Sequence, residues 1–226
     1  MPEPQSSPKF DRVAADYSRL HEQSVSASGE GIEYFAQYKV SCLKRMGVTR
    51  GDRVLDYGCG IGNITRLLVQ HFDRVTGYDP SLESLTMARA AVPGASFHAD
   101  LAELSAGTFD VAVLSGVLHH VPKSERIGVM RNVLGLLRPG GRVAIFEHNP
   151  YNPLTRHAVD TCPFDDDAVL LAPGELRRLL ADAQCVDRWQ KYIVFFPRLL
   201  RLLRPLEPAL GFFPLGAQTL TVGSRR

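Results

Sequence analysis

Short apolar segments alternate with amphipathic segments over most of the chain, and this alternation limits the folds that are possible. Five segments are strand-like: 53–57, 74–79, 95–99, 109–115 and 141–147. Four segments have apolar residues at helical spacing: 63–72, 81–91, 123–137 and 173–183. Nearly continuous apolar strands are typical of a parallel sheet that is buried on both faces. The pattern therefore predicts an α/β fold with a doubly wound sheet.

Both ends of the chain depart from this alternation. Residues 186–196 and 217–224 are both strand-like, and residues 197–216 form an insertion between them, which predicts an antiparallel pair at one side of the sheet. Residues 10–17 and 30–46 have helical spacing and predict two helices within an N-terminal cap, 10–48. We expect a disordered N-terminus at 1–9 and one domain over 10–226, because 226 residues suit a single α/β domain.

Composition and charge exclude several classes of protein. The chain is 45% hydrophobic and 22% charged with a net charge of +2, as in ordinary globular proteins, and it offers no general polycation for nucleic acid. Four cysteines without CxxC spacing indicate neither a zinc site nor a disulfide framework. The first residues lack the layout of a signal peptide, and no stretch has the roughly 18 apolar residues that span a bilayer. We therefore expect a cytoplasmic protein.

The first predicted strand runs into a glycine-rich turn, VLDYGCGIGN, at 54–63. Such a turn lets the backbone approach a ligand closely. A dinucleotide fold requires GxGxxG, but its third glycine position is occupied here by Asn63. Asp56 would repel a diphosphate and attract a cationic nucleoside with a sulfonium or ammonium group. Asp79, at the end of the second strand, is placed to accept hydrogen bonds from ribose hydroxyls.

Five motifs in order resemble the class I S-adenosylmethionine-dependent methyltransferases: VLDYGCGIG (54–62), GYDP (77–80), HADL (98–101), FDVAVLSGVLHHV (109–121) and LRPGGRVAIFE (137–147). The resemblance covers roughly residues 10–222. It implies a Rossmann-like seven-stranded sheet of order 3-2-1-4-5-7-6 with strand 7 antiparallel, and S-adenosylmethionine as cofactor.

The resemblance also implies roles for individual residues. The turn would approach the methionine part of the cofactor, and Asp79 would hold the ribose. Asp100 and Leu101 would hold the adenine, while Ser115 and Gly116 would flank the methyl group. Asp100 could instead cap a short helix. The expected cofactor-binding residues are Tyr17, Asp56, Gly58, Cys59, Gly60, Asp79, Pro80, Asp100, Leu101, Ser115 and Gly116, with Cys59 contributing its backbone.

Candidate bases follow the fourth and fifth strands of the predicted sheet. His119 and His148 are candidates to remove a proton from an acceptor hydroxyl, since an imidazole titrates near neutral pH. We expect that His119 and His120, being adjacent, do not both enter one crevice; one of them could simply pack against the sheet. Glu147 could equally anchor the turn that follows it.

Two segments after the fifth strand have unusual composition. EHNPYNPLTR (147–156) contains two Asn-Pro pairs, which predict an extended, bent path for substrate recognition. CPFDDDAVLL (162–171) has three consecutive acids, but the sequence shows no matching histidine or spaced acid for a metal site. We therefore expect a helix-capping or solvated run and no metal.

Within the insertion, Arg198, Arg201 and Arg204 recur among leucines, which predicts a short amphipathic helix ending at Pro205. It could lie on an anionic membrane through 198–204. We favour leucines that pack inward as a lid or dimer surface, in a monomer or homodimer.

The predicted function is S-adenosylmethionine-dependent methylation of a small molecule, at oxygen in the first place, without a nucleic-acid partner. The alternatives are a non-catalytic binding module for the cofactor or another nucleotide, and a methyltransferase for a lipid, glycan or macromolecule.

Overall fold

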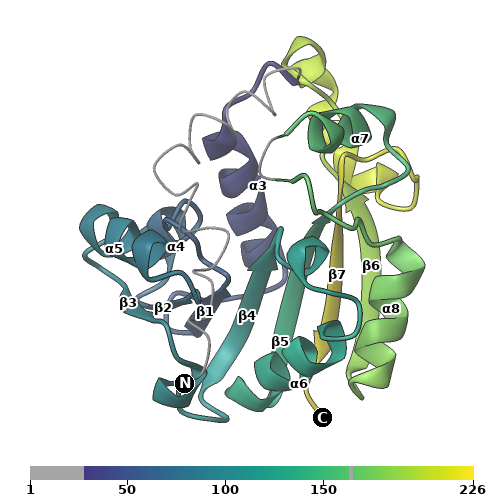
Figure 1. Cartoon of the computed structure of the whole chain (residues 1–226). Coiled ribbons are helices and arrows are strands. Elements are labelled where there is room, and N and C mark those ends of the chain that lie inside the picture. The colour runs from purple at the N-terminus through teal and green to yellow at the C-terminus, as the bar shows by residue number, and fades with distance from the viewer. Residues whose placement is uncertain (1–27, 163–164) are drawn as a thin grey trace.

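The computed structural model describes residues 28–162 and 165–226, so Tyr17 and the predictions for residues 1–27 lie outside the described residues. Its sheet has the order β3-β2-β1-β4-β5-β7-β6, and β7 runs antiparallel to both of its neighbours (Figure 1). This confirms the predicted topology. The strands are β1 (Arg53–Tyr57), β2 (Arg74–Tyr78), β3 (Ser96–His98), β4 (Phe109–Ser115), β5 (Leu137–His148), β6 (Val186–Ile193) and β7 (Gln218–Ser224).

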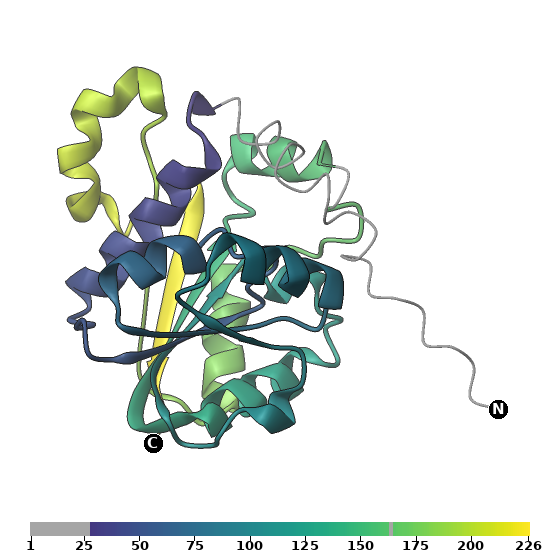
Figure 2. The same cartoon turned by 90° about the vertical axis from the view of Figure 1, so that its left-hand side faces the viewer.

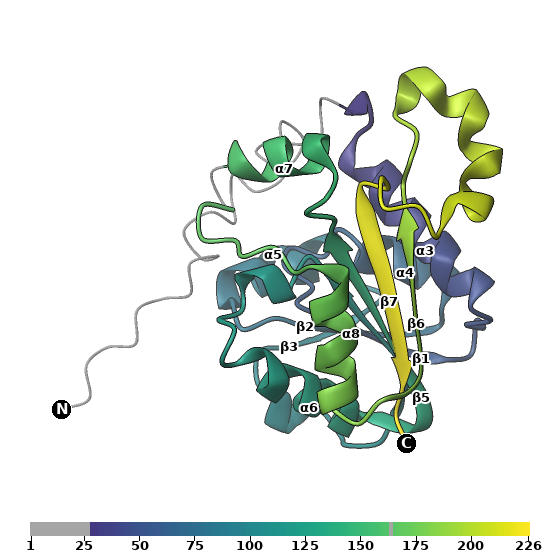
Figure 3. The ribbon, with the colours of Figure 1, turned by 90° about the vertical axis from the view of Figure 1, so that its right-hand side faces the viewer.

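Side chains alternate along the central strands and build a core on each face of the sheet. In β4, Val111 and Val113 pack on the face covered by α3 (Ile32–Arg45) and α4 (Thr65–His71). Ala112 and Leu114 pack on the opposite face with α6 (Arg126–Leu136) and α8 (Pro173–Asp182) (Figure 3). Because both faces are buried, the strand is continuously apolar from Val111 to Leu114, as the sequence indicated.

The remaining helices begin at side-chain caps. Ser81 accepts a hydrogen bond from the backbone of Ser84 and starts α5 (Leu82–Ala91). Asn152 caps α7 (Pro153–Asp160) in the same way, with Pro153 at its first position. The extended path predicted for 147–156 is therefore wrong in its second half, where the Asn-Pro pair starts a helix.

The insertion between β6 and β7 forms the 3-10 helix η4 (Arg198–Leu210) and a loop, and we call residues 197–216 the apolar lobe. Two predictions for it were wrong. The helix continues past Pro205, and its leucines do not pack inward: Leu199 is 92% exposed and Leu202 is 87% exposed.

Parallel strands end at one edge of the sheet, and this edge positions the site. The loops after β1, β4 and β5 meet there, and Figure 2 shows α7 and the apolar lobe rising beyond the same edge. Among the described residues, no helix combines the length and apolar character needed to cross a bilayer.

Candidate active site

The glycine turn after β1 has the geometry of a ligand-binding backbone. Gly58, Gly60 and Gly62 have φ values of +76°, +51° and +86°, which residues with a side chain rarely adopt. A Cβ atom on Gly58 would lie 2.6 Å from a methyl group of Val117, so this glycine is required for packing. A Cβ atom on Gly60 would meet nothing within 4 Å, because this residue borders the open pocket.

Asp79 ties the end of β2 to this turn. Its Oδ2 accepts a hydrogen bond from the backbone of Gly60 at 2.8 Å, and its Oδ1 accepts one from the backbone of Ser81 at 2.9 Å. The carboxylate of Asp79 is thereby held at the wall of the pocket, which it lines. Its ribose-binding role stays a prediction, and Pro80 beside it lines the same pocket.

Asp56 is buried under the turn. Thr65, at the start of α4, donates its hydroxyl to Oδ2 of Asp56 at 2.7 Å, so one role of this carboxylate is to join β1 to α4. Burial raises the pKa of Asp56 to about 6. The side chain also lines the pocket.

Lys39 of α3 reaches into the pocket; its segment was expected to fold over the cofactor, but the residue itself was not singled out from the sequence. Its ammonium group donates to Oγ of Ser115, at the end of β4, at 2.7 Å. Burial lowers the pKa of Lys39 to about 8, although Glu147 and Asp56 counteract this effect. One helical face of α3 carries Ile32, Phe35 and Ala36 beside Lys39, and all four line the pocket. The helical spacing of these four residues was the feature of the sequence that could have identified Lys39 as a pocket residue.

Asp100 and Leu101 lie differently from the other expected cofactor residues. Neither is among the residues that line the pocket. Asp100 accepts a hydrogen bond from the backbone of Ala102 at 2.9 Å and caps the 3-10 helix η2 (Leu101–Glu103), which was the alternative considered for it. Their contact with adenine stays a prediction.

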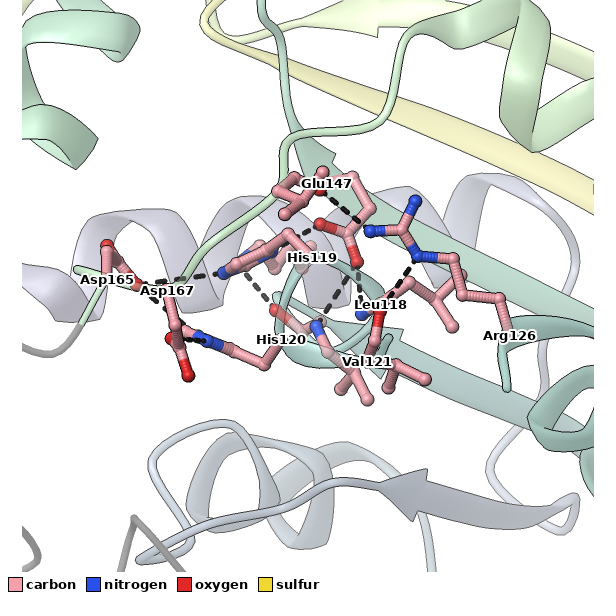
Figure 4. Close-up of polar contacts among 12 residues, drawn as sticks. Leu118, His119, His120, Val121, Arg126, Glu147, Asp165 and Asp167 are labelled. Atoms are coloured by element: carbon pink, nitrogen blue, oxygen red, sulfur yellow. Dashed lines mark hydrogen bonds and ion pairs between the residues drawn. The ribbon is translucent and has the colours of Figure 1, made fainter. Parts of the chain in front are cut away.

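Histidines that follow two strand ends line the pocket, and Figure 4 shows His119 between Glu147 and Asp165. His119 lies on the 3-10 turn η3 (Leu118–His120) after β4 and is 3% exposed. Its Nδ1 donates to Oε2 of Glu147 at 2.6 Å, and its Nε2 lies 3.8 Å from Oδ1 of Asp165. The ring centroid of His148, at the end of β5, is 5.2 Å from that of His119.

The charges of these two histidines differ. Burial lowers the pKa of His119, but the carboxylates of Glu147 and Asp165 outweigh burial and raise the pKa to about 9. Burial, together with the neighbouring His119 charge, lowers the pKa of His148 to about 3. At neutral pH the site thus combines a fixed imidazolium with a neutral imidazole.

Two expectations for this region were wrong. His119 and His120 both line the pocket, with ring centroids 4.1 Å apart, because the tight turn η3 places them side by side. Asp165 is not part of a solvated run: it is buried, and its Oδ1 lies 3.3 Å from Nε2 of His120. The loop after α7 brings this acid back over η3, which spacing along the chain could not reveal.

His119, His120 and Asp165 each offer one possible ligand atom, and these three atoms lie within 4.8 Å of one another. Among the described residues, this is the group close enough to hold a metal ion. The two histidines beside Asp165 outweigh its burial and lower the pKa of its carboxyl group.

The pocket that unites these groups has a volume of about 340 Å³, within the range of small-ligand sites. It extends from the glycine turn through Ser115 and Gly116 to the histidines, and Cys59 lines it as well. Burial raises the pKa of the Cys59 thiol, so this side chain is not a nucleophile.

A sequence profile described as a methyltransferase domain matches residues 29–188, which carry the glycine turn, Asp79 and the histidines. The chain belongs to the class I S-adenosylmethionine-dependent methyltransferases. Its cofactor is therefore S-adenosylmethionine.

Similar proteins share this domain. An uncharacterized methyltransferase of Synechocystis sp. is 33% identical over 64% of this chain and 66% of its own length. Trans-aconitate 2-methyltransferase of Rhodopseudomonas palustris is 41% identical over 41% of this chain and 37% of its own length. The chain thus matches less than two thirds of each of these relatives.

A solved structure from Thermotoga maritima has the same fold. It is described as a SAM-dependent methyltransferase and possible histamine N-methyltransferase, and it superposes with a TM-score of 0.69 at 19% identity, covering 96% of this chain and 98% of its own. The likeness concerns the fold.

The residues of this methyltransferase fit its cofactor. The open space at Gly60 admits a ligand against the turn, and the carboxylates of Asp56 and Asp79 complement a positively charged nucleoside. Lys39 offers the pocket a cation that suits an amino-acid carboxylate.

Proposed function

We propose that this methyltransferase methylates an oxygen atom of a small-molecule acceptor, with His148 as the base. The observation that carries the proposal is a neutral imidazole beside a buried imidazolium, in the pocket that also contains the glycine turn. When bound, S-adenosylmethionine supplies an electrophilic methyl group on a sulfonium.

On the cofactor side, the chain supplies binding and orientation. Lys39 would hold the amino-acid carboxylate, and Asp79 would accept the ribose hydroxyls. Asp56 stabilises positive charge from below the turn. Because the leaving group is a good one, alignment of the acceptor with the methyl group accounts for most of the acceleration.

On the acceptor side, His148 accepts the hydroxyl proton. Its lowered pKa keeps the ring unprotonated at neutral pH, so a nitrogen lone pair is available. His119 cannot easily do the same, since its two ring nitrogens face Glu147 and Asp165. We assign to His119 a positioning role: its fixed positive charge stabilises an acceptor oxygen that becomes negative.

The size of the pocket and the relatives support a small acceptor. A cavity of about 340 Å³ leaves limited space beside a nucleoside. The relative named for trans-aconitate acts on a small acid, and a carboxylate acceptor would profit from the same imidazolium without needing a base.

The test is release of S-adenosylhomocysteine by the full chain with panels of small hydroxylated, carboxylated and aminated compounds. We expect turnover with hydroxyl or carboxylate acceptors. Turnover restricted to amines would contradict oxygen as the acceptor atom. Cofactor binding by calorimetry without turnover on any panel would favour the non-catalytic binding module.

A further inference from the structure

The apolar lobe exposes apolar side chains and turns polar ones inward, which is the reverse of the usual arrangement at a surface that faces water. Leucine and phenylalanine side chains point outward: the exposed fraction is 92% for Leu199, 87% for Leu202 and 80% for Phe212. Further exposed apolar residues of the lobe are Leu200, Leu203, Leu206, Phe213 and Leu215. Such a concentration marks an interaction site.

The polar groups of the lobe are instead used to fix it to the protein. Arg204 donates to Oε1 of Glu30 at 2.7 Å and stacks on the ring of Tyr34 at 4.2 Å. Glu207 is 4% exposed and accepts hydrogen bonds from the backbone of Phe195 and Phe196, both at 3.0 Å. The outward apolar surface is therefore held in place by specific inward contacts.

The exposed charges of the lobe are all positive. Glu207 is the one acid between residues 197 and 216, and it is buried. Arg198 and Arg201 are exposed, and neither forms an ion pair with a residue in the described part of the chain. Cations beside outward leucines match the headgroup and acyl layers of an anionic bilayer, since arginine side chains can reach phosphates while apolar neighbours insert.

A second copy of the chain fits this surface less well. A symmetric contact through the same patch would bring Arg198 and Arg201 of both copies toward one interface, and like charges there destabilise association. An anionic lipid surface supplies the opposite charge.

We propose that residues 198–215 are a docking surface for an anionic lipid bilayer, with the exposed leucines and phenylalanines in the interfacial layer and Arg198 and Arg201 at the lipid phosphates. The surface rises beyond the edge of the sheet that carries the pocket (Figures 2 and 3), and α3 contacts both, because it lines the pocket and its Tyr34 packs against Arg204. Docking would bring the pocket close to amphiphilic molecules. The proposal stands independently of the acceptor assigned above.

The experiment is co-sedimentation of the full chain with vesicles of phosphatidylcholine, with and without phosphatidylglycerol. We expect binding to the anionic vesicles that weakens with salt. The double variant L199S/L202S should lose this binding. R198Q/R201Q should weaken it by about 30-fold, which corresponds to about 1 kcal/mol for each of the two basic residues at an anionic surface.

A matched control, R177Q/R178Q, removes two exposed cations from α8 and should bind as the wild type does. Since Leu199 and Leu202 are solvent-exposed, L199S/L202S should keep the wild-type melting temperature and cofactor affinity. The proposal is overturned if the wild type ignores anionic vesicles or if L199S/L202S still binds them. It is also overturned if, without lipid, the wild type is a dimer that L199S/L202S converts to monomers, since the surface then serves a second copy.

Discussion

Glu147 and His119 are joined by a hydrogen bond of 2.6 Å between the carboxylate and Nδ1, which connects the end of β5 to the turn after β4. The other carboxylate oxygen accepts the backbone N–H groups of Leu118 at 2.8 Å and Val117 at 3.2 Å. A single carboxylate therefore fixes both the backbone of the turn and the charge of the imidazole.

Replacing Glu147 by Gln should lower the pKa of His119. In the folded wild type this pKa is about 9, above the ordinary value of 6.5. The stability that protonated His119 contributes is thus complete below pH 6.5 and is lost as the pH rises through 9, on the order of 1–3 kcal/mol.

Urea unfolding at pH 6.5, 8 and 9.5 measures this contribution, and NMR titration of the histidine follows the pKa. We expect the wild type to lose stability over this range and E147Q to lose less. Equal losses in both proteins would show that His119 does not carry the charge.

Replacing His148 by Gln should reduce kcat by about 10²–10⁴-fold, because a glutamine cannot accept the proton. Cofactor affinity should change little. His157→Gln, on the exposed surface of α7, is the matched control and should behave as the wild type. Calorimetry and initial rates separate the two effects. An unchanged kcat in H148Q would remove His148 from the mechanism and favour a carboxylate acceptor.

Lys39→Met should weaken cofactor binding by about tenfold or more, because a charge-assisted contact is lost. Stability should not fall, since a methionine in place of a buried cation removes a desolvation cost. The comparison of S-adenosylmethionine with its decarboxylated analogue locates the contact. The wild type should prefer the carboxylated form, and K39M should not.

Lys44→Met, on the exposed surface of the same helix, controls for the loss of a positive charge. If K39M retains the preference for the carboxylated cofactor, Lys39 serves another part of the pocket.

The strands could be located from the sequence because that information is local, whereas the order of the strands was implied by the resemblance to a known family. Alternation along β4 and the glycine turn both depend on neighbouring residues. Asp165, by contrast, reaches His119 across 46 positions, from a segment after α7 that has no periodicity. The sequence also could not predict whether the leucines of the apolar lobe point inward or outward, since an amphipathic segment fits either arrangement equally well.

Gly58→Ala should destabilise the fold by about 1–3 kcal/mol, through a left-handed backbone and overpacking. The added Cβ atom would lie 2.6 Å from Val117, and the φ value is +76°. Gly128→Ala is the control, because this glycine lies within α6 with open space around it and should gain about 0.5–1 kcal/mol. Thermal and urea unfolding provide the comparison. Equal stability of G58A and the wild type would show that the turn can rearrange.

Chelation should leave methyl transfer unchanged. The carboxylates of Glu147 and Asp165 raise the pKa of His119 to about 9 despite its burial, so at neutral pH a proton occupies the nitrogen that a metal would need. Protein treated with EDTA and assayed without added metal should keep the kcat of untreated protein.

Asp165→Asn should lower the pKa of His119 with or without EDTA, since the carboxylate acts there as a counter-charge. Loss of activity on chelation, restored by Zn²⁺ or Mn²⁺ in the wild type but not in D165N, would instead assign His119, His120 and Asp165 to a metal centre.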